Sequence, residues 1–298
     1  MSHHHHEAGD TASWRLFLTM LLNFVITAVE IIGGIMSGSL SLISDALHNF
    51  SDGIAIIISY IAVRLNRRPK TAQYTFGLKR AEILAAIINS SALIIISFFL
   101  LKEAYERFTH PSSVSGGLMM GVAGIGLIAN VAGTLLLRKG AKSSMNLRSV
   151  YLHLLSDAAS SVAVILGGAA IYFYEIYWLD PVLTVLIALY ILKESMQINK
   201  EALQVMLMAS PEGISIEALS TTIKEIPGVN NVHHIHLWRL DEHDIHFEAH
   251  VEVDDMPVSA AEEILQKIQK RLLEKFNINH VTVQFEIDRC QEKTLVAH

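Results

Sequence analysis

Two pairs of a histidine and an aspartate, each pair four residues apart, lie in long apolar segments. The pairs are His48 with Asp52 and His153 with Asp157. On a helix, residues four apart share one face, with their Cβ atoms about 5–6 Å apart. Ionisable groups at membrane depth are costly and mark ion pathways. Two imidazoles and two carboxylates are the ligands of a tetrahedral zinc site, so the sequence predicts such a site between two helices.

The predicted site favours carrying a metal ion over using it in catalysis. Two carboxylates neutralise a divalent cation, and four protein ligands leave no open position for a catalytic water. No His-Glu-x-x-His motif occurs, so we expect no enzyme activity. Metal ligands must lose their protons, and histidine titrates near pH 6.5. We therefore expect Zn²⁺ and H⁺ to be exchanged at the same residues.

Other interpretations of these residues remain. Each His–Asp pair could be a buried hydrogen bond between helices, although two identical spacings favour a metal. Asp45 is a candidate fifth ligand, and we favour instead a supporting role behind the ligands. Glu30 shares a helical face with Asn23 and Thr27 and is a candidate for a role beside a water-filled cavity. Asparagines and serines in the other apolar segments predict helix–helix hydrogen bonds.

The elements that must position these residues are six membrane helices. The chain is 51% apolar and has a positive mean hydropathy, as is typical of membrane proteins. The expected order is a His-containing flexible tail (1–13), a transmembrane domain (14–208) and a soluble domain (209–298). The predicted spans are 14–36, 40–65, 77–108, 116–137, 148–174 and 179–207.

The last ninety residues predict a small α+β domain. Residues 214–226 and 259–276 have helical patterns, and the first pattern ends before Pro227-Gly228. Residues 232–240 and 244–254 predict a hairpin, and 281–287 alternate as a final strand. The predicted fold class is thus an all-α six-helix membrane domain followed by a C-terminal αββαβ domain with helices on one face of a sheet.

Charge fixes the expected orientation and excludes some partners. Basic residues gather between spans two and three and between spans four and five, which predicts that these loops and both termini are cytoplasmic. The net charge of -6 argues against nucleic-acid binding. Cys290 is the single cysteine, so no intrachain disulfide forms. The run 3–6 is either an expression tag or a metal-collecting tail.

The chain resembles the cation diffusion facilitator transporters, closest to the bacterial zinc/cadmium/cobalt resistance branch. The matching stretches are 39–52, 74–82, 151–157 and 236–238. The resemblance implies a homodimer in the inner or plasma membrane, with a metallochaperone-like cytoplasmic domain on each subunit. It also implies Zn²⁺/H⁺ antiport by alternating access. Family members with histidine at the position of His48 are more selective for zinc than those with aspartate there, so the resemblance favours zinc selectivity. A broader exporter of Cd²⁺ or Co²⁺, a metal sensor and a channel are the alternatives.

The resemblance also implies metal binding in the cytoplasmic domain. The matching positions are His233, His250 and Glu286. Gln284 stands where some relatives have a liganding histidine, which puts a full two-metal site in doubt. The alternative is a solvated strand pair that is merely rich in histidine. The segment 73–79, where some relatives bind metal, holds no histidine or acid, so we expect no site there.

Overall fold

The computed structural model describes all residues except 1–3, 67–68, 139–144, 242–243, 290–292 and 297–298. The chain divides into two compact units. The first holds residues 1–61 and 88–199, and the second holds 62–87 and 200–298. The second unit therefore takes in the end of the second helix and the start of the third, which the predicted boundary at 208/209 left with the membrane domain.

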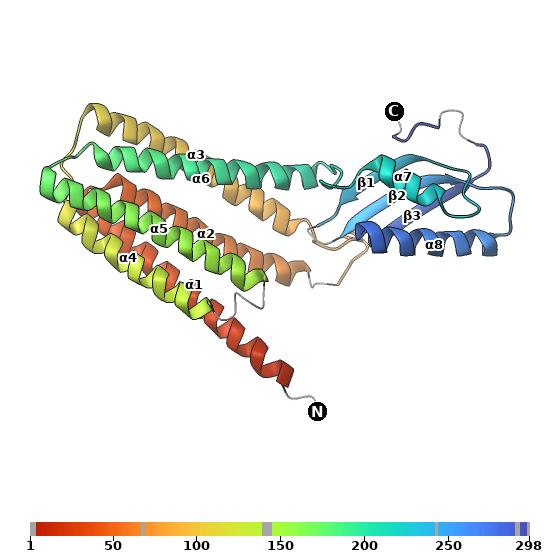
Figure 1. Cartoon of the computed structure of the whole chain (residues 1–298), viewed down its shortest axis with the longest axis horizontal. Coiled ribbons are helices and arrows are strands. Elements are labelled where there is room, and N and C mark those ends of the chain that lie inside the picture. The colour runs from red at the N-terminus through yellow and green to blue at the C-terminus, as the bar shows by residue number, and fades with distance from the viewer. Residues whose placement is uncertain (1–3, 67–68, 139–144, 242–243, 290–292, 297–298) are drawn as a thin grey trace. The chain divides into compact units, whose positions relative to one another are not determined.

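In the described residues before position 207, six long helices follow one another, as predicted (Figure 1). They are α1 (His4–Ser37), α2 (Leu40–Asn66), α3 (Ala81–Thr109), α4 (Gly116–Leu137), α5 (Met145–Tyr174) and α6 (Leu179–Met206). The helix α1 begins at His4, within the segment 1–13 that we expect to be a tail. Each residue added to an existing helix gains a hydrogen bond without a new nucleation cost, so the apolar span extends into its polar leader.

Within the described residues, four helical segments are long and apolar enough to cross a membrane. They are Ala81–Thr109, Gly116–Leu136, His153–Tyr174 and Leu179–Met206, and Leu21–Ser37 is a shorter apolar helix. Large apolar side chains such as Phe99, Ile128 and Leu166 are more than half exposed. An apolar surface of this extent is typical of contact with lipid.

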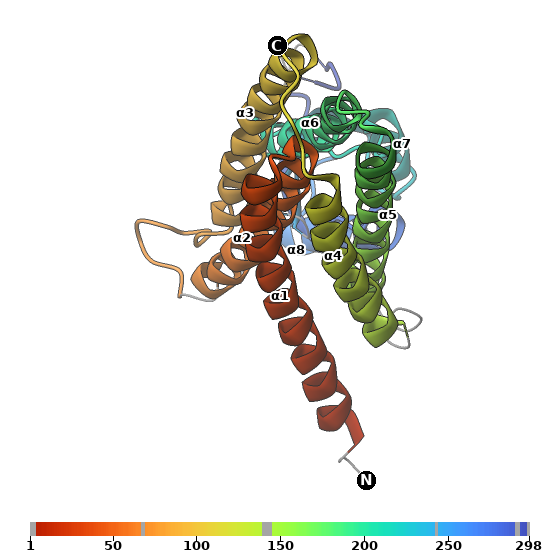
Figure 2. The same ribbon diagram turned by 90° about the vertical axis from the view of Figure 1, so that its left-hand side faces the viewer.

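Glycines set the close approach of α4 to its neighbours α1 and α5 (Figure 2). A Cβ on Gly116 would lie 2.5 Å from the carbonyl oxygen of Gly168 in α5. A Cβ on Gly126 would lie 2.5 Å from the Glu30 carboxylate in α1. Gly121 and Gly124, two small residues of the same helix, have no such neighbour within 4 Å among the residues that the structure describes. Close packing is thus confined to particular turns of α4.

The start of α2 is held by a carboxylate that is distant in the sequence. Asp180, fully buried in the first turn of α6, accepts hydrogen bonds from the hydroxyls of Ser39 and Ser41 at 2.7 Å each. It also accepts from the backbone N–H groups of Leu40 and Ser41 at 2.9 and 3.2 Å. The first N–H groups of a helix lack partners within that helix, and Asp180 supplies acceptors for two of them in α2. Its negative charge also interacts favourably with the positive N-terminal end of the helix dipole.

The C-terminal elements form the predicted α+β order (Figure 1). They are α7 (Ile216–Lys224), β1 (Asn231–Arg239), β2 (Ile245–Glu252), α8 (Val258–Phe276) and β3 (His280–Glu286). The sheet order is β1-β2-β3, with β1 antiparallel and β3 parallel to β2. A strand–helix–strand connection gives the parallel pair, because α8 returns the chain to the starting end. The turn expected at 241–243 lies partly outside the described residues.

Alternation along the strands separates an apolar face from a polar face. Phe247, Ala249 and Val251 of β2 are buried in one core with Ile268 and Leu272 of α8. The intervening residues of β2 point to the other face, as the sequence pattern predicted. Two columns cross this polar face in register: Trp238, His246 and His280 form one, and His233, His250 and Gln284 form the other.

Candidate metal centre

The two His-x-x-x-Asp pairs lie on α2 and α5 and meet inside the helical unit. The His48 Nε2 atom lies 3.5 Å from Asp52 Oδ2, and His153 Nε2 lies 3.5 Å from Asp157 Oδ2. His153 Nε2 also lies 3.2 Å from Asp52 Oδ2, which joins the two helices. The two imidazole rings are 5.9 Å apart and nearly perpendicular. These four residues are called the helix site below.

Burial differs across the helix site. The Asp157 side chain is 4% exposed, whereas that of His153 is 37% exposed. His48, Asp157 and His153 each offer a ligand atom within 4.8 Å of the others. The buried Asp157 carboxylate and the partly exposed His153 thus place a shielded and an accessible ligand atom side by side.

Asp45 lies outside the helix site and faces α5. Its Oδ1 atom accepts a hydrogen bond of 2.6 Å from the Ser160 hydroxyl, and the residue is 3% exposed. The bond ties α2 to α5 one turn from the ligands. This contact fits the supporting role that we favoured over a fifth ligand.

A second polar contact behind the helix site was not predicted. Asn49, the neighbour of His48 in the chain, donates from Nδ2 to Glu30 Oε2 at 3.0 Å. Glu30 is fully buried, and the Asn23 amide donates to the Asn49 carbonyl at 3.2 Å. The shared helical face of Asn23 and Glu30 was visible in the sequence, but its partner on α2 was not.

Tyr190 of α6 is another neighbour that sequence reasoning missed. Its ring lies 6.1 Å from the His48 ring in an edge-on arrangement. A tyrosine within an apolar segment was the only signal for it. The predicted helix–helix hydrogen bonds are confirmed for Ser51 with Asn89, at 3.1 Å, and for Ser90 with Asn199, also at 3.1 Å.

A second cluster lies on the polar face of the sheet. His233 Nε2 is 2.7 Å from Glu286 Oε1, and His250 Nδ1 is 3.3 Å from Glu286 Oε2. The side chains of His233 and Glu286 are 1% and 2% exposed, so a solvated strand pair is wrong for these two residues. The side chains of β1 and β3 reach over β2 to meet. These three residues are called the sheet site below.

The surroundings of His250 favour its neutral imidazole. Burial lowers the pKa of His250, and the nearby His234 and His233 lower it further against the opposing charge of Glu286. The His234 ring stacks on His250 at 4.6 Å. Gln284 is paired with His250 in the strand register. The position at which some relatives have a liganding histidine therefore lies beside the sheet site. Neutral imidazole and a carboxylate are suitable zinc ligands.

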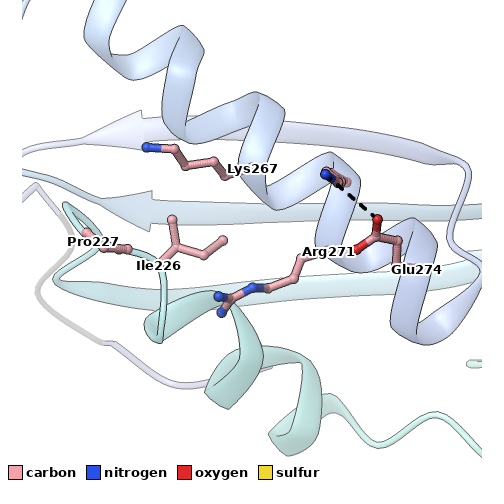
Figure 3. A pocket seen from close by; sticks show the side chains of 6 residues that line it. Ile226, Pro227, Lys267, Arg271 and Glu274 are labelled. Carbon is pink, nitrogen blue, oxygen red and sulfur yellow. Dashed lines mark ion pairs between the residues drawn. The ribbon is translucent and has the colours of Figure 1, made fainter.

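A shallow pocket on α8 offers different chemistry. It is lined by Lys267, Lys270, Arg271 and Glu274 together with Ile226 and Pro227 (Figure 3). Lys270 pairs with Glu274 at 4.0 Å, and Arg271 pairs with Glu225 at 3.2 Å. Acids thus pair with two of the three basic side chains that line the pocket, as is common on a solvated charged surface.

Comparison with known proteins places both parts of the chain in one family. Residues 16–207 match the cation efflux transmembrane domain. Residues 211–288 match the cation efflux protein cytoplasmic domain. The first match covers all four residues of the helix site, and the second covers all three residues of the sheet site.

Full-length relatives are similar to this chain over nearly its whole length. A cadmium, cobalt and zinc/H(+)-K(+) antiporter of Bacillus subtilis is 35% identical over 97% of this chain and 93% of its own. The metal cation efflux system protein CzcD of Cupriavidus metallidurans is 35% identical over 99% and 92%. The zinc transporter ZitB of Escherichia coli is 35% identical over 97% and 93%. The chain therefore belongs to the cation efflux family and is a multi-pass membrane transporter of metal cations, with a cytoplasmic domain after its transmembrane domain.

Proposed function

We propose that this protein exports Zn²⁺ from the cytoplasm in exchange for H⁺ and binds Zn²⁺ at His48, Asp52, His153 and Asp157. One observation carries the proposal. The three His–Asp contacts of the helix site span 3.2–3.5 Å. Ligand distances of about 2.0–2.1 Å in a tetrahedral zinc site correspond to ligand–ligand edges of about 3.3 Å.

Proton exchange follows from the chemistry of these ligands. Zinc binds deprotonated histidine and aspartate, so loading the site releases protons on the side from which zinc arrives. After zinc leaves on the other side, the imidazoles and carboxylates regain protons. The bonds between α2 and α5 are then His–Asp contacts such as that of His153 with Asp52. Alternating access of one site to the two membrane faces completes the cycle.

The orientation and assembly belong to the same proposal. The basic loops after spans two and four support cytoplasmic termini. The match to the family's cytoplasmic domain supports a homodimer, in which each subunit carries its own helix site. Zinc at the sheet site would act as a regulator, because the sheet lies in the soluble domain and offers no path across the membrane.

Transport into proteoliposomes tests the proposal. Vesicles that are acidic inside should take up zinc through outward-exposed cytoplasmic faces, and collapsing the gradient should abolish uptake. The variants His48→Ala and Asp157→Ala should lose transport, whereas His110→Ala, which changes an exposed histidine after α3, should keep it. Uptake that ignores the gradient would refute proton coupling. Normal uptake by both site variants would refute the site.

Cadmium and cobalt are the second candidate substrates. The names of two relatives include other metals or metal cations in general. Competition for zinc uptake by Cd²⁺ and Co²⁺ distinguishes a zinc-selective carrier from a broader one. Two nitrogen and two oxygen ligands in a tetrahedron favour zinc, so we expect weaker competition from both.

A further inference from the structure

Glu30 is a buried carboxylate that the helix site does not use. It lies within α1, is fully buried, and forms no ion pair with a basic residue in the described part of the chain. An ionised carboxylate without a cationic partner is strongly disfavoured in a membrane interior. Its Oε2 atom accepts one hydrogen bond from Asn49, which only partly replaces water. The neutral, protonated form of Glu30 is therefore favoured when no cation is near.

The space around Glu30 fits a proton better than a metal ion. Its Oε1 atom faces α4, where a Cβ on Gly126 would come within 2.5 Å of it. The glycine thus makes room for the carboxylate and for little else. A bound metal ion would need several further oxygen ligands around that atom. A proton needs only one acceptor within hydrogen-bond distance.

Asn49 can serve Glu30 in both protonation states. Among the described residues, neither Glu30 Oε1 nor Asn49 Oδ1 has a hydrogen-bond partner. When Glu30 is ionised, the Asn49 amide donates to it, as the structure shows at 3.0 Å. When Glu30 carries a proton, a half-turn of the amide would present Asn49 Oδ1 as the acceptor of the carboxyl O–H. An amide holds a donor and an acceptor on one group, so each state finds a partner.

The contact leads directly to the ligands. Asn49 follows His48 in the chain, so any change in the Glu30–Asn49 bond acts on the turn of α2 that holds a ligand. Asp45 and Asp157 are the charged side chains that act on Glu30 from α2 and α5. A divalent cation at the helix site offsets these negative charges and favours ionised Glu30. When the cation leaves the helix site, the protonated form of Glu30 is favoured.

We propose that Glu30 is a proton-binding site separate from the metal ligands, which loses its proton when the metal binds and regains it when the metal leaves. This inference rests on the proposed Zn²⁺/H⁺ exchange. On loading, the O–H bond of Glu30 breaks and the proton leaves to water. On release, the same bond forms again, and no other covalent bond changes. Glu30 is thus a positioning and proton-carrying residue, and it does not touch the metal.

Proton release on zinc binding tests the inference. The purified full-length protein is titrated with zinc in buffers of differing ionisation enthalpy, and the protons released per bound zinc are counted. Glu30→Gln keeps the shape and is always neutral, so it should bind zinc but release about one proton fewer. Glu106→Gln removes an exposed carboxylate of α3 and should release as many as the unchanged protein. Equal release by Glu30→Gln and the unchanged protein would overturn the inference.

Infrared difference spectroscopy keeps the inference testable if Glu30→Gln folds poorly. In the unchanged protein, zinc should remove a carbonyl band of a protonated carboxyl group. The same band should be shifted but still lost on zinc binding in Glu30→Asp. A spectrum without such a band would refute the inference while leaving exchange at the ligands intact. If the unchanged protein releases no protons at all, the proposed exchange itself fails, so the two failures are distinct.

Discussion

His153 of α5 lies 3.2 Å from Asp52 of α2, and this contact between helices is shorter than the 3.5 Å contact within either His–Asp pair. The four residues of the helix site are therefore organised across the two helices rather than along each one. A ligand set divided in this way changes when α2 and α5 move relative to each other. Such a set suits a carrier, which must bind on one side and release on the other.

Replacing Asp52 should affect both helices at once. In Asp52→Asn, the oxygen shared by His48 and His153 loses its charge. We expect zinc affinity to fall at least about 100-fold, at or beyond the upper end of the loss seen for groups that only support a ligand. Zinc titration of the purified protein measures this, and proteoliposome uptake should be lost.

Ser44→Ala is the matched control for Asp52→Asn. It changes a buried hydroxyl two turns earlier in α2 that is not a member of the helix site. Zinc affinity within a few-fold of the unchanged protein in Asp52→Asn would contradict its role as a ligand.

Ser160 offers a test of Asp45 that leaves the carboxylate in place. Ser160→Ala removes the 2.6 Å bond to Asp45 and leaves all four ligands intact. Loss of a supporting bond costs about 10–100-fold in metal affinity. Zinc titration should show a fall in this range, and Ser160→Thr, which keeps the hydroxyl, should restore most of the affinity. An unchanged affinity in Ser160→Ala would limit Asp45 to helix packing.

Much of this architecture is predictable from local sequence patterns. Helical spacing places His48 beside Asp52, and period-two alternation places His250 on the polar face of the sheet. Partners distant in the sequence are not predictable in this way. Asp180 meets Ser39 across 141 residues, and no periodicity relates them. The contacts of Tyr190 with His48 and of Glu30 with Gly126 depend likewise on how helices pack, which a single sequence pattern does not encode.

Asp180 should matter for folding rather than for metal binding. Asp180→Asn removes the negative charge at the N-terminus of α2 and weakens four hydrogen bonds. A hydrogen bond to a charged group contributes about 1.5–3 kcal/mol, so we expect a loss of at least about 2 kcal/mol. The thermal unfolding midpoint in detergent should fall clearly.

Thr184→Ala is the control for Asp180→Asn. It removes only a neutral 2.9 Å bond to the Asp180 carbonyl and should have a smaller effect on the midpoint. Equal unfolding midpoints for the two variants would show that the negative charge of Asp180 does not stabilise the fold.

Acid should destabilise the soluble domain through His246. Burial lowers the pKa of this imidazole, nearby His280 and Lys79 lower it further, and Asp241 opposes them. An unfolded histidine has a pKa of about 6.5. The folded state thus binds the proton less tightly, so the stability from neutral His246 is present above about pH 6.5 and is lost as pH falls below it.

Denaturant unfolding of the soluble domain in the full-length protein between about pH 5 and 8 measures this dependence. His246→Gln should flatten it. His236→Gln, which changes an exposed residue of β1 on the same face of the sheet, should not flatten it. An unaltered pH profile in His246→Gln would assign the acid sensitivity to other groups.

Glu286 joins the two histidines of the sheet site and should control its zinc. Each carboxylate oxygen approaches one imidazole, at 2.7 and 3.3 Å. In Glu286→Gln, the charge that offsets a divalent cation is lost, so we expect one fewer zinc ion to bind per chain while the helix site still binds zinc. Glu248→Gln removes an exposed carboxylate of β2 on the same face of the sheet, and this variant should bind zinc as before. Counting bound zinc by titration distinguishes these outcomes. Retention of the full zinc count by Glu286→Gln would show that the three residues form a buried His–Glu contact without a metal function.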